Sequence, residues 1–434
     1  MARNRVIYQS EALFAGQKST RTTVTEAHAQ GDIRQIHRVQ SANYSFNIAR
    51  TDVNQFGELA AIDRVALETP TVSLDFTYLL ANFANEENLG FFVNEYGTRN
   101  QHLGSALSGV LNKTEDIRNY FIQTSREGED AIGDDNRDAD GMLGGSRKSA
   151  DVIGIGNAFI TSYSTEASVG GFPTVSISAE GMNMNFNTGT QGILNPAINS
   201  TNGTAASTTI NLPPVSGNAD LFPASAVDEI EAALAISTLR PGDITIKIAE
   251  HNENGQFGAT HYDAGMPGAK LPEDDGTSTN SANIQSYTIN FDMGRTAIQR
   301  LGNRFAFARE IDFPVNVNLS FDAILTDLTT GNLNQLIDCE KAYDIRIQLD
   351  GVTGACGQSK GKIAEYYMKN MKPDAQSYGS SIGDNKTVTL DFTTQIGGPN
   401  QNNVGLYMRG LTQTVTGSSE SDGDYGPGPG FNDG

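Results

Sequence analysis

Residues 40–76, QSANYSFNIARTDVNQFGELAAIDRVALETPTVSLDF, match residues 285–321, QSYTINFDMGRTAIQRLGNRFAFAREIDFPVNVNLSF, without a gap. At a constant offset of 245, 11 of the 37 aligned positions are identical. Unrelated segments of this length would share only about two or three, so chance is a poor explanation. The sequence therefore indicates two copies of one unit. The copies preserve strand pattern and turn residues rather than a set of catalytic groups.

Apolar and polar residues alternate through corresponding parts of both copies, and this is the period of a β-strand. The pattern predicts a mainly β fold with two tandem β-sandwich or barrel domains, each with a short flanking helix. The flanking helices are expected at 86–94 and 332–339, and a further helix at 226–239. Further strands are expected at 116–123 and 344–348. Alternating runs at 182–186 and 388–392 are interpreted as corresponding strands that close each unit.

The domain boundaries follow from composition. A Gly-, Ser-, Thr- and Asn-rich stretch between the copies is typical of a linker or long surface loop. The expected order is a first domain at 1–198 with an acidic, glycine-rich insertion at about 127–148, a linker at 199–217, a second domain at 218–415, and a flexible acidic Gly/Pro-rich tail at 416–434.

The charge balance excludes several classes of partner. Lys and Arg number 30 against 51 Asp and Glu, so the net charge of −21 opposes general affinity for phosphate backbones or anionic membranes. The polar positions of the alternating runs are Thr, Ser, Asn and Asp, without Lys or Arg. No apolar run reaches the roughly 20 residues of a membrane helix, and the N-terminus lacks a secretory signal. We expect no membrane partner and synthesis that ends in the cytoplasm.

Candidate metal, cofactor and catalytic motifs are weak. The alternating oxygen ligands of one acidic run resemble the start of a calcium loop, but the twelfth position is Arg147, where a bidentate Glu is required. A solvated loop is the favoured interpretation of that run, whose candidate ligands are Asp134, Asn136, Asp138 and Asp140. The triple His251, His261 and Asp263 fits no zinc spacing, and Gly154-Ile155-Gly156 lacks the third glycine of a nucleotide loop. The sequence predicts no catalytic residue, no metal and no cofactor.

A repeated arginine–threonine pair ends one strand in each copy, as Arg50-Thr51 and Arg295-Thr296. Two interpretations stay open: the arginine forks bind carboxylates or carbonyls of a neighbouring subunit, or they cap the loop that follows within the domain. A glycine lies farther along each loop, Gly57 or Gly302, and is expected at a turn with positive φ.

The stretch RVALETPTVSLDFTY at 64–78, with the strand and loop NYSFNIARTDVNQFGELAAI at 43–62 before it, resembles the tail tube proteins of long-tailed bacteriophages. Residues 305–324 are a more degenerate version. The resemblance implies six-fold rings of small β domains, stacked into a tube whose inner β-barrel conducts genomic DNA. Because this chain has two such units, three chains supply a six-unit ring, a pseudo-hexamer, and a trimer is favoured over a hexamer.

The resemblance also implies roles for individual residues. Arg50, Thr51, Arg295 and Thr296 would contact a neighbouring subunit or ring. The lumen would be lined by Asp75, Asp292, Asp322 and Asp391. The protein would then be a non-enzymatic major tube subunit of the virion, made in the host cytoplasm. Its partners would be further copies, a sheath, and baseplate or terminator proteins, and DNA would pass without specific binding.

Three rival functions stay open. The first is a tail terminator, neck or baseplate ring of the same fold, which caps a tube without polymerising. The second is a calcium-stabilised β adhesin, supported only by the acidic run. The third is a β-sandwich hydrolase, for which the sequence supplies carboxylates but no arrangement that singles out two of them.

Overall fold

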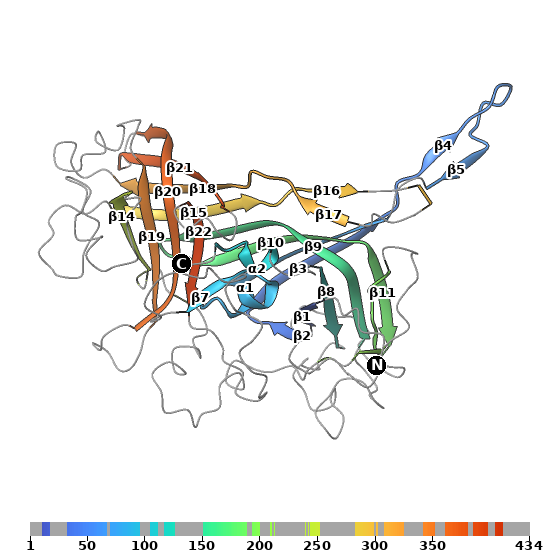
Figure 1. The fold of residues 1–434 in the computed structure, drawn as a ribbon, viewed down its shortest axis with the longest axis horizontal. Helices are drawn as coiled ribbons and strands as arrows, with labels where there is room; N and C mark the ends of the chain where they lie inside the picture. The colour runs from blue at the N-terminus through green and yellow to red at the C-terminus, as the bar shows by residue number, and fades with distance from the viewer. Residues whose placement is uncertain are drawn as a thin grey trace, which may run out of the picture.

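A computed structural model gives the fold of the chain (Figure 1). The described residues are mostly strand, which confirms the mainly β fold. They comprise 11–17, 33–66, 70–95, 105–111, 117–125, 151–188, 193–199, 209–210, 212, 239, 242, 244–251, 283–298, 301–302, 308–324, 342–351, 361–380, 385–397 and 404–410.

One long antiparallel sheet runs through both halves of the chain (Figure 1). β9 and β15 are neighbours in it, with Ser164 opposite Asn290, so the sheet passes from the first half to the second without a break. Eight of its strands lie side by side in one row, and we call this row the long sheet. Their order is β3 (Val39–Asn47), β6 (Thr71–Leu79), β10 (Thr174–Gly181), β9 (Asp151–Ser168), β15 (Asn283–Asp292), β18 (Asn316–Ile324), β21 (Thr387–Gln395) and β20 (Gly361–Gly379).

Two smaller groups of strands form a second layer. They pair with the N-terminal parts of β9 and β20, which leave the long sheet. The group at β9 contains β8 (Arg118–Thr124), β1 (Glu11–Gln17), β2 (Ile33–Ile36) and β11 (Asn183–Thr188). The group at β20 contains β19 (Tyr343–Gly351), β14 (Ile244–Glu250), β22 (Gly405–Gly410) and β7 (Val93–Glu95). The helices α1 (Ala84–Leu89) and α2 (Ser108–Leu111) lie in the middle of the molecule (Figure 1).

Two hairpins extend from the long sheet. The first pairs β4 (Thr51–Val53) with β5 (Asp63–Val65), and the second pairs β16 (Arg295–Ile298) with β17 (Ala308–Ile311). The β4–β5 hairpin projects away from the rest of the molecule, whereas β16–β17 runs beside the long sheet (Figure 1). The two hairpins have matching registers 245 residues apart.

Irregularities recur at the offset of 245 found in the sequence. Gln40 and Gln285 are the extra residues of bulges where β3 meets β6 and where β15 meets β18. Gly57 and Gly302 have φ of 93° and 89°, which confirms the predicted positive-φ turns.

A second set of irregularities recurs at an offset of 213. β9 has a bulge at Thr161 against β10, and β20 has one at Asp374 against β21. Asn157 and Asn370 adopt φ of 53° and 56° at corresponding places in the same two strands. The strand order β3-β6-β10-β9 therefore has the same backbone construction as β15-β18-β21-β20.

The core lies between the long sheet and the second layer. The predicted alternation is confirmed in β6 and β18, where Val72, Leu74 and Phe76, like their counterparts in β18, are buried. One continuous cluster of buried apolar side chains contacts both the first strand set, β3-β6-β10-β9, and the second strand set, β15-β18-β21-β20, so the two halves share a core. Two residues of the predicted linker, Ile210 and Leu212, are buried in a separate small cluster, and β13 (Thr209–Ile210) pairs there with β12 (Ile193–Leu194).

Several sequence-based assignments change in the structure. The predicted strands at 116–123 and 344–348 are β8 and β19. The predicted helix at 86–94 is shorter, because Gly90 adopts φ of 99° and ends α1 after Leu89, and β7 follows. The predicted helices at 226–239 and 332–339 lie outside the described residues apart from Leu239, which is buried.

The interpretation of 182–186 and 388–392 as corresponding strands is wrong. β21 lies between β18 and β20, the place that β10 occupies between β6 and β9. β11 instead pairs with the lower part of β9, as β22 pairs with β20. β10 alternates as regularly as β21 does. Only the strand order shows that β10, and not β11, is the counterpart of β21.

Glycines allow close approach in β9. A Cβ at Gly156 would lie 2.1 Å from the carbonyl oxygen of Pro196, and one at Gly154 would lie 2.3 Å from Asn185 Oδ1. The Gly154-Ile155-Gly156 motif is therefore explained by packing of the segment 193–199 and of Asn185 against β9.

We expect Gly156→Ala to destabilise the protein by about 1–3 kcal/mol, because a backbone neighbour must move to admit the methyl group. Thermal unfolding followed by circular dichroism would measure the loss. Gly242→Ala is the matched control, since nothing lies within 4 Å of its Cβ position. Equal unfolding temperatures for the two variants would contradict this account of the motif.

Candidate functional site: the polar face and open edges of the long sheet

The long sheet has one face on which most side chains are polar. The four predicted lumen residues, Asp75, Asp292, Asp322 and Asp391, all lie on this side, which we call the polar face. Its other members are alternate residues of the eight strands, chiefly Ser, Thr and Asn with Glu166 and Glu180. The structure thus brings residues from distant parts of the sequence onto one surface.

Hydroxyl groups on the polar face donate to its carboxylates. Asp322 accepts from Ser286 Oγ at 2.9 Å and from Thr389 Oγ1 at 2.6 Å. Asp391 accepts from Ser320 Oγ at 2.6 Å. These cross-strand bonds hold the side chains down on the sheet and leave acceptor oxygens and negative charge directed outward.

Basic side chains are rare on this face. Lys372 of β20, opposite Thr393, is its one Lys or Arg among the described residues of the eight strands. Sequence analysis missed it because residues 364–369 of β20 are buried on both faces, so the strand does not alternate throughout. Phosphate groups near the polar face would therefore meet weak repulsion and few cationic partners.

The long sheet ends in two open edges. Among the described strands, β3 pairs only with β6, and residues 375–379 of β20 pair only with β21. Phe46, near the end of β3, is 44% exposed, whereas the identical Phe291 at the same place in β15 is 1% exposed. Tyr378 on the other edge is 48% exposed. The edges therefore expose both backbone groups and apolar side chains.

The β9–β15 boundary shows how such edges are covered within the chain. Phe291 stacks on Tyr163 with ring centroids 5.2 Å apart, and Phe91 packs edge-on against Tyr163. The Tyr163 hydroxyl lies 2.6 Å from that of Tyr366, and it donates to Glu86 Oε1 at 3.2 Å. Side chains of both strand sets thus form one buried aromatic and hydrogen-bonded group.

Glu86 of α1 is a fully buried carboxyl group in this network. Its Oε1 accepts from Tyr78 at 2.8 Å, and its Oε2 has no hydrogen-bond partner among the described residues. Burial raises the pKa of Glu86 to about 7, although the two tyrosine hydroxyls and Arg38 favour the charged form. The folded protein therefore holds a proton here that the unfolded chain releases near pH 4.5.

Because the pKa of Glu86 is higher in the folded state, its contribution to the free energy of unfolding falls as pH rises from about 4.5 to 7. We expect Glu86→Gln to stabilise the protein at pH 8 by roughly 1–3 kcal/mol and to change it little at pH 4.5. Urea unfolding at both pH values measures this, with exposed Glu58→Gln as control. A variant that loses the same stability at both pH values would contradict the assignment.

The two repeated arginine–threonine pairs have different environments. Arg295 lies over the ring of Phe159 in β9, 4.7 Å from its centroid, and its Nη1 donates to the Arg309 carbonyl at 3.3 Å. Thr296 Oγ1 donates to the Asp312 carboxylate at 2.9 Å. Arg50 and Thr51 begin the projecting hairpin and are exposed. Arg295 thus meets the other strand set of its own chain, and Arg50 faces solvent.

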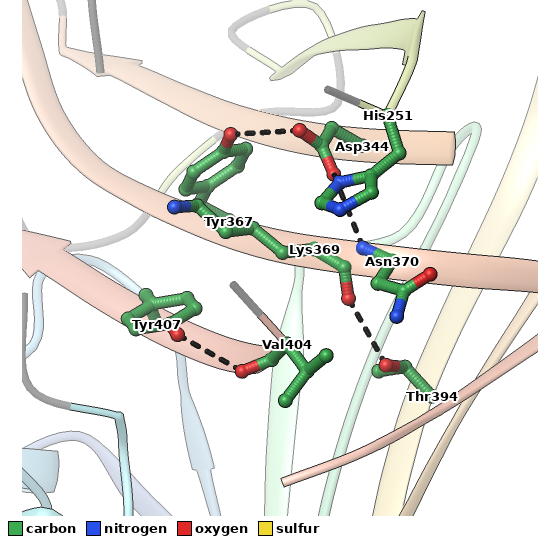
Figure 2. A network of polar contacts seen from close by, with 8 residues as sticks. All are labelled: His251, Asp344, Tyr367, Lys369, Asn370, Thr394, Val404 and Tyr407. Carbon is green, nitrogen blue, oxygen red and sulfur yellow. Dashed lines mark hydrogen bonds and ion pairs between the residues drawn. The ribbon is translucent and has the colours of Figure 1, made fainter. Parts of the chain in front are cut away.

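A charged cluster lies beneath the second strand set (Figure 2). His251 Nδ1 is 2.7 Å from Asp344 Oδ1, which also accepts from the backbone N–H of Asn370 at 3.1 Å. Tyr367 donates to Asp344 Oδ2, and the Lys369 ammonium lies between the rings of Tyr367 and Tyr407. Burial lowers the pKa of Lys369 to about 8.

The corresponding place in the first strand set explains this cluster. There Asn119 Oδ1 accepts from the N–H of Asn157 at 3.1 Å. Both arrangements hold a positive-φ residue where a long strand bends, so Asp344 has a structural role that the neutral Asn119 also performs. Of the candidate triple His251, His261 and Asp263, only His251 lies in the described part of the chain.

The candidate calcium ligands Asp134, Asn136, Asp138 and Asp140 lie outside the described residues. Within the described ranges, no three His, Cys, Asp or Glu residues are grouped so that they could hold a metal ion. In that same part of the chain, no helix has the length and apolarity needed to span a bilayer.

Comparisons with known proteins give only weak structural likeness. No family model and no curated protein matches the sequence. One similar solved structure is the 6-fold symmetrised cryo-EM structure of the anti-feeding prophage baseplate, at 10% identity and a TM-score of 0.24, covering 39% of this chain and 93% of that one. A second is the crystal structure of Hcp protein, at 7% identity and a TM-score of 0.20, covering 39% and 98%. The functional argument therefore rests on this chain's own pairing and charge.

Proposed function

We propose that this protein is the major subunit of a phage-type tail tube, which assembles by pairing the open edges of its long sheet with those of further copies. The observation that carries the proposal is the contrast between Phe46 and Phe291. The same residue at the same strand position is buried where β15 meets β9 and half exposed where β3 meets solvent. Edge pairing between chains removes both liabilities of the open edges, unpaired backbone and exposed aromatic rings.

We also propose that the chain is a tandem duplication, with domains at 1–198 and 218–415, a linker at 199–217 and a tail at 416–434. Support comes from the matching strand orders, bulges and positive-φ residues described above. Duplication makes the β9–β15 boundary a template for the contact between chains. In that template β3 of one chain runs antiparallel to 375–380 of the next.

The template gives a register for the contact. Phe291 is opposite Tyr163, and by the two offsets Phe46 would be opposite Gln376. The side-chain nitrogen of Gln376 is buried without a hydrogen-bond partner among the described residues, as expected at an edge that pairs with another chain on assembly. The contact is heterologous, and a heterologous contact repeated about a rotation axis closes into a ring.

Three chains would close the ring, in agreement with the pseudo-six-fold order that the sequence resemblance implies. They would supply 24 strands, eight from each chain. Strands about 4.8 Å apart and tilted by about 40° then give a backbone barrel roughly 50 Å across. Since barrels of 16–18 strands already leave an aqueous channel, this one would be wide enough for a DNA duplex.

In this assembly the polar face lines the lumen. Asp75, Asp292, Asp322 and Asp391 would face the passing DNA, with few cations to retain it. The protein is then a non-enzymatic virion component, and a sheath and baseplate or terminator proteins are its further partners. The hairpin tips, with Phe56, Leu59 and Leu301 fully exposed, are positioned to contact the next ring.

We expect Phe46→Asp to prevent ring formation, raising the concentration for assembly at least about tenfold, because the carboxylate would be buried at the edge contact. Phe172→Asp is the matched control: the same substitution on a ring that is 57% exposed between β9 and β10, away from both open edges and both hairpin tips. Sedimentation velocity and negative-stain microscopy would report mass and symmetry.

Wild-type rings with three-fold or pseudo-six-fold symmetry that stack into tubes would support the proposal. Rings that never stack would replace it with the terminator, neck or baseplate role. Assembly of Phe46→Asp as efficient as that of wild type, or a wild-type protein that stays a single chain at high concentration, would contradict edge pairing.

A further inference from the structure

The β16–β17 hairpin docks on the other strand set of its own chain. Arg309 of β17 forms an ion pair with Glu180 of β10, and the Arg309 side chain is only 7% exposed. Arg295 of β16 covers the ring of Phe159, which lies opposite Glu180 in β9. In this internal docking the hairpin supplies the cations, and the sheet supplies an anion and an aromatic ring.

The β4–β5 hairpin has a face that corresponds to the docked face of β16–β17, but it is exposed and packs on no other described part of its own chain. Asp52 is opposite Arg64, as Ala297 is opposite Arg309, and residues opposite each other share a face of a hairpin. Asp52 and Arg64 are bonded to each other at 2.6 Å and exposed. Edge pairing of two chains would bring this face over β20 and β21 of the neighbour.

At three matched positions the internal docking site is uncharged and the open docking site is charged, and at a fourth the internal Glu180 is matched by the uncharged Thr393. On the sheet, the internal site has Phe159 and Thr161, and the open site has Lys372 and Asp374 at the matched positions. On the hairpin, the docked copy has Ala297 and the free copy has Asp52. The first two pairs are 213 residues apart and the third pair 245. Each of these three positions is uncharged inside the chain and charged at the open edges.

These charges are complementary. The open sheet edge has a cation at Lys372, and the free hairpin has an anion at Asp52 on the face that would meet it. Arg50, at the place of Arg295, would also come near Lys372, because Arg295 lies over the ring of Phe159, and Asp374, two residues farther along β20, supplies a second carboxylate there. The bulge residue belongs to this contact, because in the internal junction the Thr161 carbonyl accepts from the Met293 N–H at 2.7 Å.

We propose that consecutive copies of this chain are joined by an ion pair between Asp52 on the hairpin of one copy and Lys372 on the sheet of the next. This ion pair rests on the edge pairing proposed above and makes that pairing specific. A carboxylate can accept from Arg64 and Lys372 together, so the pair within the hairpin persists. Lys372, the one basic residue of the polar face in the described part of the chain, then has a role in assembly.

The arrangement also excludes a wrong pairing. The β4–β5 hairpin has arginines at the same two places, Arg50 and Arg64, so the difference lies in Asp52: a β16–β17 hairpin on the neighbour's open site would place Arg295 and Arg309 beside Lys372 without this carboxylate. Like charges brought together at an interface favour the correct partner. The charges at the two sites therefore determine which hairpin docks where.

Charge reversal tests the ion pair on the full chain. We expect Lys372→Glu or Asp52→Lys alone to raise the concentration for ring assembly about tenfold or more, and the double variant to return within about threefold of wild type. Mass photometry over a concentration series measures this at low salt, where exposed charges are least screened. Glu58→Lys is the matched control: the same charge change on the same hairpin, beyond the docking face.

The outcomes separate this inference from the proposed function. Wild-type rings, weak assembly of both single variants and recovery in the double variant would support the ion pair. Single variants that assemble as wild type does, or a double variant no better than the singles, would overturn the ion pair and leave edge pairing intact. A wild-type protein that forms no rings would overturn both. Circular dichroism confirms that each variant is folded, as expected for exposed positions.

Discussion

Unpaired backbone at the edge of a sheet is the constraint on which this structure depends. An antiparallel strand has N–H and C=O groups on both sides, and those of an edge strand remain available to another chain. The molecule satisfies this requirement once internally, where β9 meets β15, and leaves it unmet at β3 and at 375–379 of β20. Bending of β9 and β20 into the second layer commits their N-terminal halves to the core and leaves their C-terminal halves for edge contacts.

The two kinds of edge differ chemically for a physical reason. A junction within one chain is always occupied, so it can be apolar and permanent, as the buried group of Tyr163, Phe291 and Glu86 is. A junction between chains is exposed whenever the subunit is free, and large apolar patches on a free subunit promote indiscriminate association. The open edge has Gln376 and Lys372 where the internal junction has Tyr163 and Phe159. These polar side chains reduce that risk, and they still allow a contact of defined shape and charge.

Sequence analysis predicted the parts of the fold that local pattern determines. The offset of 245 located β3, β6, β15 and β18 and the polar face, because one apolar side per strand gives a period of two. β9 and β20 were missed, since half of each strand is buried on both faces and loses alternation, as with Val152 and Ile153. Strand order was also beyond the sequence: only pairing shows that β10, not β11, corresponds to β21. Lys372 was missed for the same reason, because its place on the polar face follows only from the position of β20.

The chemistry of the polar face fits the position inside a closed assembly that we propose for it. Carboxylates gathered on a concave surface repel one another, and this would oppose ring closure if the charges were close and unscreened. Here Asp322 and Asp391 accept hydrogen bonds from neighbouring hydroxyl groups, and Ser, Thr and Asn separate the acids. With a Debye length of about 8 Å at physiological salt, charges across a wide lumen are almost independent. The face can therefore be acidic enough to prevent phosphate binding at little cost to assembly.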